Sequence, residues 1–321
     1  MSGAAALPER PASMMIPFAP WEIGLMRLGV ALLVFFSLPQ RVPFRGTPFP
    51  NGVGRFLDLG FLAQPGVWSM LRWALMPALL AYVCGRLTVL ALGLMVAVVV
   101  GYGALENSQG AISHQRQMLA MVLVAQWVMC LWDVGRDALR GKLRIWKDDT
   151  ARQRRLAHAA RVLIAAAYLT CAITKLDNSH GEWLLRTPNL APQIIKTHAN
   201  WYFDTLQPTD TFFATTVPQW MIEHPDLTRV LFAPGLLLEL FLFLGLLGRI
   251  WSLVLGVNTI LLHWGIGVIM MLFFDQHIWL LLIFFVNPAY WLVAWVPQML
   301  GRCRDSVPAA TPVARPQRSE C

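Results

Sequence analysis

Long apolar segments separated by shorter polar ones run through most of this sequence. Several of the apolar segments approach the roughly 20 residues that an α-helix needs to cross a bilayer. The pattern predicts an all-α fold, a polytopic membrane bundle of about eight transmembrane helices. The expected spans lie at residues 22–38, 67–83, 87–105 and 117–132, then inside 157–183, and finally at 228–247, 251–272 and 277–296.

The same pattern divides the chain into a short N-terminal segment at residues 1–20, the bundle at 21–298 and a Pro/Ala/Thr-rich tail at 299–321 that we expect to be disordered. Residues 39–65 mix phenylalanines with Pro, Gly and Arg, which suits a segment at the membrane interface. Residues 177–226 form the longest polar stretch, and their aromatic side chains predict amphipathic or re-entrant pieces over one end of the bundle. A kink is expected at the Asn287–Pro288 step, because proline removes a backbone donor.

Composition and charge agree with a membrane protein. The chain is 56% hydrophobic and 14% charged, whereas soluble domains carry about 25% charged residues. The net charge of +8 would suggest a nucleic-acid partner in a soluble protein, but here the basic residues concentrate in particular loops, so we exclude nucleic acid. Residues 133–155 contain eight Arg and Lys residues and are expected to form a cytoplasmic loop. With eight spans, both termini would then be cytoplasmic.

The fifth expected span carries three polar residues at intervals of seven, Arg161, Tyr168 and Lys175. Positions seven apart drift by only about 20° around a helix, so the three form one polar stripe on an apolar rod. An ionisable group at this depth needs a partner, a water-filled cavity or the interface, and is a functional-site candidate. For Lys175 the alternative is a side chain that reaches the interface and has no further role.

Three more polar residues fall in or beside the spans: His114, Glu239 and His263. Glu239 is either part of a site or a protonated acid bonded to a neighbouring helix, since a carboxylate at a helix centre costs a few kcal/mol in a bilayer. The two histidines either line the same pocket or are ordinary loop and packing residues. Because burial disfavours the charged form of an amine, Lys175 in such a pocket would suit the role of general base.

No metal site is expected. HxxxH, HExxH and facial-triad spacings do not occur, and we place His263 and His277, which are 14 residues apart, at different depths. The five cysteines show no paired spacing, so we interpret them as small packing residues.

The spacing in the fifth span resembles a known family. The run from Arg161 to Trp183, R-x6-Y-x6-K-L-D followed by a tryptophan, is similar to the corresponding helix of vitamin K-dependent gamma-carboxylase and of the related bacterial HTTM (horizontally transferred transmembrane) proteins. The Ser113–His114 pair resembles the segment that lies at the quinol site of that family.

Further positions extend the resemblance over residues 21–290. Gly235-Leu-Leu-Leu-Glu239-Leu is similar to the G-L-L-L-D-L of the family, with Glu in place of Asp. His263 follows Glu239 at the interval that the family uses, and Arg27 fits an early arginine of its first helix.

The resemblance implies a multi-pass protein of a bacterial plasma or inner membrane that uses reduced vitamin K or another quinol. It implies that Lys175, His114 and His263 are catalytic, with Lys175 as the base that deprotonates the quinol. It also implies that Tyr168, Arg161 and Glu239 bind the cofactor. The substrate stays open, with a secreted or membrane peptide or protein as one option.

The resemblance does not include the large lumenal domain with which the carboxylase holds its glutamate substrate, so peptide carboxylation is not implied for this chain. Two alternatives to an enzyme also stay open. The same pocket would also serve a non-catalytic protein that binds a quinone or lipid and assists the maturation or immunity of a partner system. A transporter is the third function class.

Overall fold

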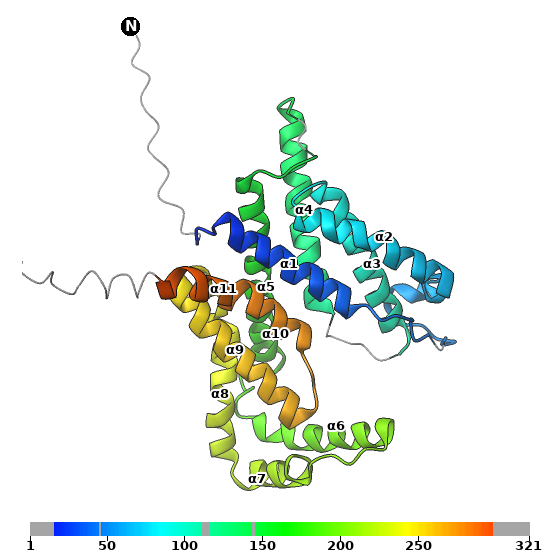
Figure 1. The fold of residues 1–321 in the computed structure, drawn as a ribbon. Helices are drawn as coiled ribbons and strands as arrows, with labels where there is room; N and C mark the ends of the chain where they lie inside the picture. The colour runs from blue at the N-terminus through cyan, green and yellow to red at the C-terminus, as the bar shows by residue number, and fades with distance from the viewer. Residues whose placement is uncertain (1–15, 45, 111–115, 143–144, 298–321) are drawn as a thin grey trace, which may run out of the picture.

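The computed structural model describes residues 16–44, 46–110, 116–142 and 145–297, and Figure 1 shows them as a bundle of helices of unequal length. Within these ranges eight helical segments are long and apolar enough to cross a membrane, and no β-strand occurs. The all-α bundle predicted from the hydrophobic pattern is therefore confirmed.

The eight segments overlap the eight expected spans. They are α1 (Pro20–Ser37), α2 (Pro65–Val83), α3 (Thr88–Ser108), α4 (Gln117–Leu139), α5 (Thr150–Asn178), α8 (Pro225–Phe241) continued by the 3-10 turn η5 (Leu242–Leu246), α9 (Arg249–Met270), and a last span that contains α10 (Asp275–Leu281) and α11 (Pro288–Tyr290). A π-helical turn follows each of the last two, η6 (Leu282–Val286) and η7 (Trp291–Trp295). The expected kink is confirmed, because Asn287 adopts a left-handed φ of 47° between η6 and α11.

The prediction of a loop over residues 133–155 is wrong in its extent. α4 continues to Leu139 and α5 begins at Thr150, so half of the charged residues of this stretch lie on helices. Asp149 caps α5, since its side chain accepts a hydrogen bond of 2.7 Å from the backbone nitrogen of Arg152. The helices extend beyond their apolar parts because their charged side chains pair with one another, as described below.

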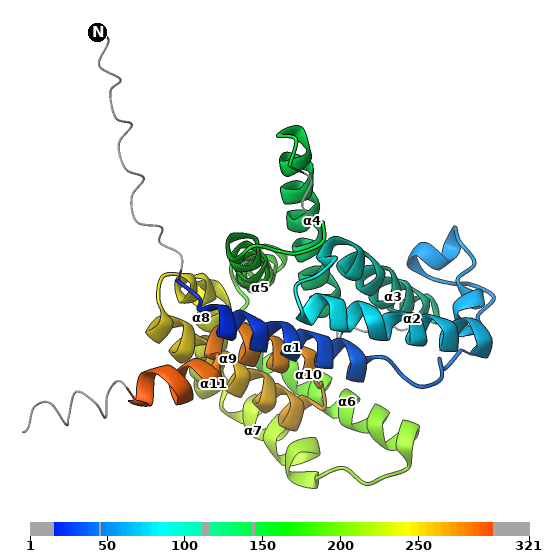
Figure 2. The same ribbon diagram turned by 45° about the horizontal axis from the view of Figure 1, so that its top comes forward.

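Helix α1 lies between two groups of helices, with α2 and α3 on one side and α8 and α9 on the other (Figure 2). α5 contacts α1 and α4 as well as α8 and η5. Buried aliphatic and aromatic side chains of α1 to α5, α10 and η6 form one continuous core. In this arrangement one face of α5 meets the second half of the chain, and that face carries the polar stripe.

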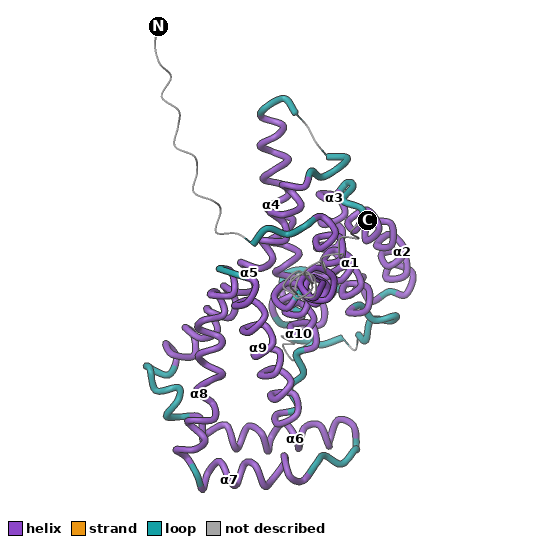
Figure 3. Tube along the Cα trace, turned by 60° about the vertical axis from the view of Figure 1, so that its left-hand side comes forward, coloured by secondary structure: helices purple, strands orange, loops and turns teal. Residues whose placement is uncertain are grey.

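Two short helices cross one end of the bundle. α6 (Leu190–Thr205) and α7 (Val217–Glu223) contact each other beyond the ends of α8 and α9 (Figure 3). Nε2 of His198 in α6 lies 3.0 Å from the carbonyl oxygen of Ile269 in α9, and Ala191, Ile194 and Met221 form a small core between the two helices. The amphipathic pieces expected between residues 177 and 226 therefore exist as helices.

Candidate functional site

Tyr168 in α5 and His263 in α9 form the deeper of two polar pairs. The phenolic oxygen lies 2.5 Å from Nε2 of the imidazole, and both residues are buried. The His263 ring also packs against the rings of Phe274 and His277, at centroid distances of 5.0 and 5.5 Å. Its other nitrogen, Nδ1, is buried and has no hydrogen-bond partner among the described residues. One imidazole nitrogen of the pair is therefore buried without a partner in the described part of the chain.

Lys175 in α5 and Glu239 in α8 form the second pair. Nζ donates to both carboxylate oxygens, at 2.6 Å to Oε1 and 2.5 Å to Oε2. The Lys175 side chain is 35% exposed and that of Glu239 9% exposed, and the ammonium lies 5.2 Å from the centre of the Trp183 ring. Lys175 is thus held by a carboxylate and an aromatic face, rather than extending alone to the interface.

The two pairs belong to one site. Tyr168 and Lys175 are two turns apart on the same face of α5, about 10 Å along the helix axis. α8, which carries Glu239, contacts both α5 and α9, which carries His263. We call these four residues the α5–α8–α9 site, after the helices that carry them.

The structure separates Arg161 from this site. Arg161 lies on the same face of α5, but seven residues before Tyr168 and 14 before Lys175, which is about 21 Å from the lysine along the axis. Its Nη2 donates to the carbonyl oxygen of Gly245 at 2.7 Å and to Oγ of Ser252 at 2.9 Å. A shared face therefore does not give a shared site. His114, the remaining predicted residue, lies outside the described residues.

The prediction that His263 and His277 lie at different depths is wrong. The chain reverses after α9, where Met271 takes a left-handed φ of 54°, and α10 begins at Asp275. This short reversal sets the first turn of α10 beside the last turns of α9, so the two imidazoles are neighbours. Across the described ranges, no cluster of three or more His, Cys, Asp and Glu side chains is arranged to hold a metal ion.

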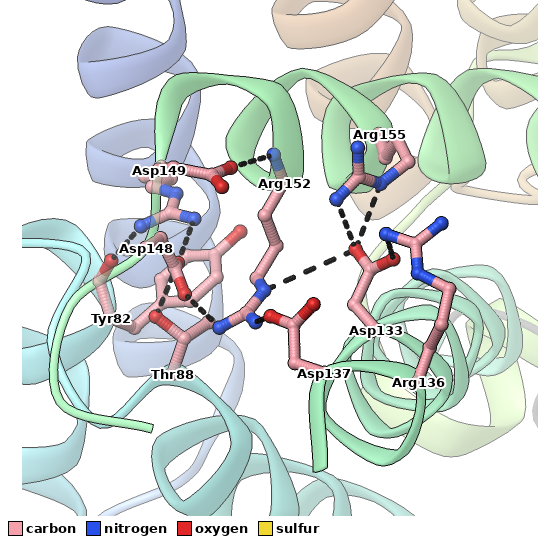
Figure 4. Close-up of polar contacts among 10 residues, drawn as sticks. Tyr82, Thr88, Asp133, Arg136, Asp137, Asp148, Asp149, Arg152 and Arg155 are labelled. Carbon is pink, nitrogen blue, oxygen red and sulfur yellow. Dashed lines mark hydrogen bonds and ion pairs between the residues drawn. The ribbon is translucent and has the colours of Figure 1, made fainter. Parts of the chain in front are cut away.

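Sequence reasoning missed a second polar constellation, where the end of α4 and the start of α5 (Figure 4) meet Arg27 of α1 and Thr88 of α3. Asp148 is its centre. One carboxylate oxygen accepts from Nη2 of Arg27 at 2.7 Å and from Oγ1 of Thr88 at 2.6 Å. The other accepts from Nη1 of Arg152 at 3.4 Å. Arg27, Thr88, Asp148 and Arg152 are all buried.

Arg152 extends this network to α4. It donates from Nη2 to Asp137 at 2.8 Å, and Asp133 on the same helix pairs with Arg155 at 2.8 Å and with Arg136 at 3.2 Å. Asp133 and Asp137 are one turn apart and face the start of α5 (Figure 4). In the sequence, the only sign of this network is that Asp133 and Asp137 stand 15 to 22 positions before the basic residues that they bind. A count of the arginines alone does not include these acids.

The comparisons with known proteins add no relative. Neither protein-family models, nor curated proteins, nor solved structures give a match to this chain. The described residues themselves establish a helical bundle with eight candidate membrane spans and a polar site between α5, α8 and α9.

Proposed function

We propose that the chain is a multi-pass membrane enzyme that accepts a proton from a quinol at the α5–α8–α9 site. The observation that supports this most is the meeting of Tyr168–His263 and Lys175–Glu239 on one face of α5. Ionisable groups inside an apolar bundle are costly, and they are typically retained where a proton or a charged ligand is handled.

The residues of the site fit a flat aromatic ligand with hydroxyl groups. Phe274 and Trp183 offer ring surfaces beside the polar pairs. If Tyr168 donates to Nε2 of His263, the neutral imidazole carries its hydrogen on the partnerless Nδ1 and offers it to a ligand oxygen. When bound, a quinol would supply two electrons and a weakly acidic hydroxyl group.

The Lys175–Glu239 pair supplies the base in this proposal. Both carboxylate oxygens lie within 2.6 Å of Nζ, so the two groups would act together on a ligand hydroxyl. The carboxylate would accept the proton, and the ammonium beside it would stabilise the quinolate oxygen that forms. The Tyr168 hydroxyl and His263 would orient the same ligand from the deeper side.

The sequence supports a reaction class and a side of the membrane for this proposal. The resemblance of α5 to the carboxylase helix supports oxidation of the quinol by oxygen, coupled to chemistry on a second substrate. Lys175 lies 25 residues after the start of α5, about 38 Å from the end that carries the basic residues. If the basic end is cytoplasmic, the site opens toward the outside.

Turnover tests this function. Purified protein in lipid nanodiscs, given a reduced naphthoquinone and oxygen, should oxidise the quinol. Lys175→Ala should abolish the reaction, whereas Lys196→Ala, which removes an exposed lysine from α6, should leave it unchanged. Equal turnover in wild type and Lys175→Ala would reject the assignment.

One observation favours the non-catalytic alternative. An apolar groove of about 440 Å³ lies between α1 and the last span, and is lined by residues that include Gly29, Phe36, Trp279 and Ile283. It is large enough for an isoprenoid or acyl chain. Quinone binding that persists in Lys175→Ala, without any turnover in wild type, would support a binding protein.

A further inference from the structure

Arg161 is a fully buried arginine. Its exposed fraction is 0%, and Nε and Nη1 have no hydrogen-bond partner among the described residues. Within the described part of the chain, no carboxylate lies within the 4.0 Å of an ion pair with it. Burying an arginine without a counter-charge is strongly unfavourable, so the position requires an explanation.

The groups around Arg161 are neutral. Nη2 bonds to the Gly245 carbonyl and the Ser252 hydroxyl, and the hydroxyl in turn donates to the carbonyl oxygen of Phe285 at 2.7 Å. The guanidinium lies over the rings of Phe18 and Phe285, at 5.4 and 5.2 Å. Oxygens and rings of this kind solvate a cation in part, but they do not neutralise it.

A second arginine makes the local charge balance positive. Arg249, the first residue of α9, lies over the same Phe18 ring at 5.5 Å. It is neutralised by Glu22, which it contacts at 2.8 and 3.0 Å. Glu22 also accepts from Asn287 at 2.7 Å and from the backbone of Ala19 at 2.9 Å, so its oxygens are fully used. In the part of the chain that the structure describes, one positive charge, that of Arg161, is left over.

A small cavity lies between these groups. Arg161, Arg249, Ser252, Phe18 and Phe285 line it. The cavity also adjoins the N-terminus of α9, where Gly248 provides no side-chain cap. The free backbone N–H groups and the dipole of a helix start favour a negative charge there.

We propose that this cavity binds a single small monovalent anion of the chloride class, with Arg161 as its counter-charge. The free volume of about 10 Å³ admits a particle the size of one water molecule. A phosphate or a lipid headgroup is too large for that space. A halide fits best because it is a single atom only slightly larger than a water molecule and needs no fixed hydrogen-bond geometry. Water alone would fill the space but leave the charge of Arg161 uncompensated.

The anion would also have a structural effect. Arg161 belongs to α5, Arg249 and Ser252 to α9, Phe285 to η6 and Phe18 to the segment before α1. An ion held among them joins four parts of the bundle at the end opposite to the α5–α8–α9 site. This inference does not depend on the proposed quinol chemistry.

Halide-dependent stability tests the proposal. The full chain is purified in detergent with sodium gluconate, and gluconate is then replaced by chloride or bromide at constant ionic strength. The midpoint of thermal unfolding should rise with halide concentration, by about 2 °C for each tenfold increase above half-saturation. The excess broadening of the chloride-35 NMR line should saturate and be reversed by bromide.

Variants locate the effect. Arg161→Met should unfold at the same temperature in chloride and gluconate, while Arg186→Met, which removes an exposed arginine, should keep the wild-type response. If Arg161→Met does not fold, the wild-type NMR titration decides alone. An absent chloride response in wild type would overturn the proposal, as would an equal response in Arg161→Met. A response to phosphatidylglycerol in nanodiscs but not to chloride would also overturn it.

Discussion

The ammonium of Lys175 lies 2.5 and 2.6 Å from the two carboxylate oxygens of Glu239, a residue 64 positions later in the chain. This contact joins α5 to α8 within a mostly apolar interface. Removing one partner leaves the other charge without compensation, whereas removing both leaves neutral side chains of similar size. The pair therefore makes a distinct prediction for stability.

Lys175→Met should destabilise the protein by about 2–3 kcal/mol, less than for a fully buried pair because the lysine is partly exposed. The double variant Lys175→Met/Glu239→Gln should recover most of that loss, because the amide needs no counter-charge. Thermal unfolding in detergent measures both. A double variant that is as unstable as the sum of the single variants would show that the contact is not the cause.

The Asp148 network predicts a larger loss at the other end of the bundle. Asp148→Asn removes the only described carboxylate partner of Arg27 and one partner of Arg152, both buried, and should cost about 3–5 kcal/mol. Asp226→Asn is the matched control, because its pair with Arg229 is exposed and is expected to contribute less than about 1 kcal/mol. Similar melting temperatures for the two variants would contradict the structural role of Asp148.

Packing of α9 against the last span predicts a contrast between two helical glycines. A Cβ at Gly256 would lie 2.9 Å from Cβ of Phe285, whereas one at Gly135 in α4 would meet nothing within 4 Å. Gly256→Ala should therefore destabilise the protein by about 1–3 kcal/mol. Gly135→Ala should be neutral or stabilise by up to about 1 kcal/mol, since alanine favours helix more than glycine does. A neutral Gly256→Ala would mean that α9 and the last span are packed less closely.

The distribution of basic residues predicts which side of the membrane each end faces. In a cysteine-free background, Leu206→Cys after α6 should react with a membrane-impermeant maleimide in intact cells. Leu139→Cys at the end of α4 should react only after permeabilisation. Both positions are exposed, so the difference reports sidedness rather than burial. The opposite pattern would invert the topology and place the α5–α8–α9 site toward the cytoplasm.

The spans could be predicted from the sequence because the length of an apolar segment is a local property. The candidate residues of the site were also recognisable, since polar groups such as Glu239 and His263 are rare within such segments. Their pairing was not recognisable. That Tyr168 contacts His263, and Lys175 contacts Glu239, depends on how α8 and α9 pack on α5, which periodicity within one helix does not determine.

The sequence-based interpretation was incomplete at two points. The interval of seven residues places Arg161 and Lys175 on one face of α5, but the rise of about 1.5 Å per residue separates them along the helix axis. The arginines of residues 133–155 were counted as charges of a loop. Asp133, Asp137 and Asp148 bind several of them in buried pairs, so part of that charge fixes helices to one another.

The most direct test of the central claim is a double-mutant cycle in quinol turnover. The values of kcat/KM are measured for wild type, Tyr168→Phe, Lys175→Met and the double variant in nanodiscs, with folding checked by thermal unfolding. If the two pairs act as one proton-transfer site, Lys175→Met should lose at least about 100-fold and the double variant should be no slower than Lys175→Met alone. Single effects that multiply in the double variant, or wild-type turnover in both single variants, would contradict a shared site.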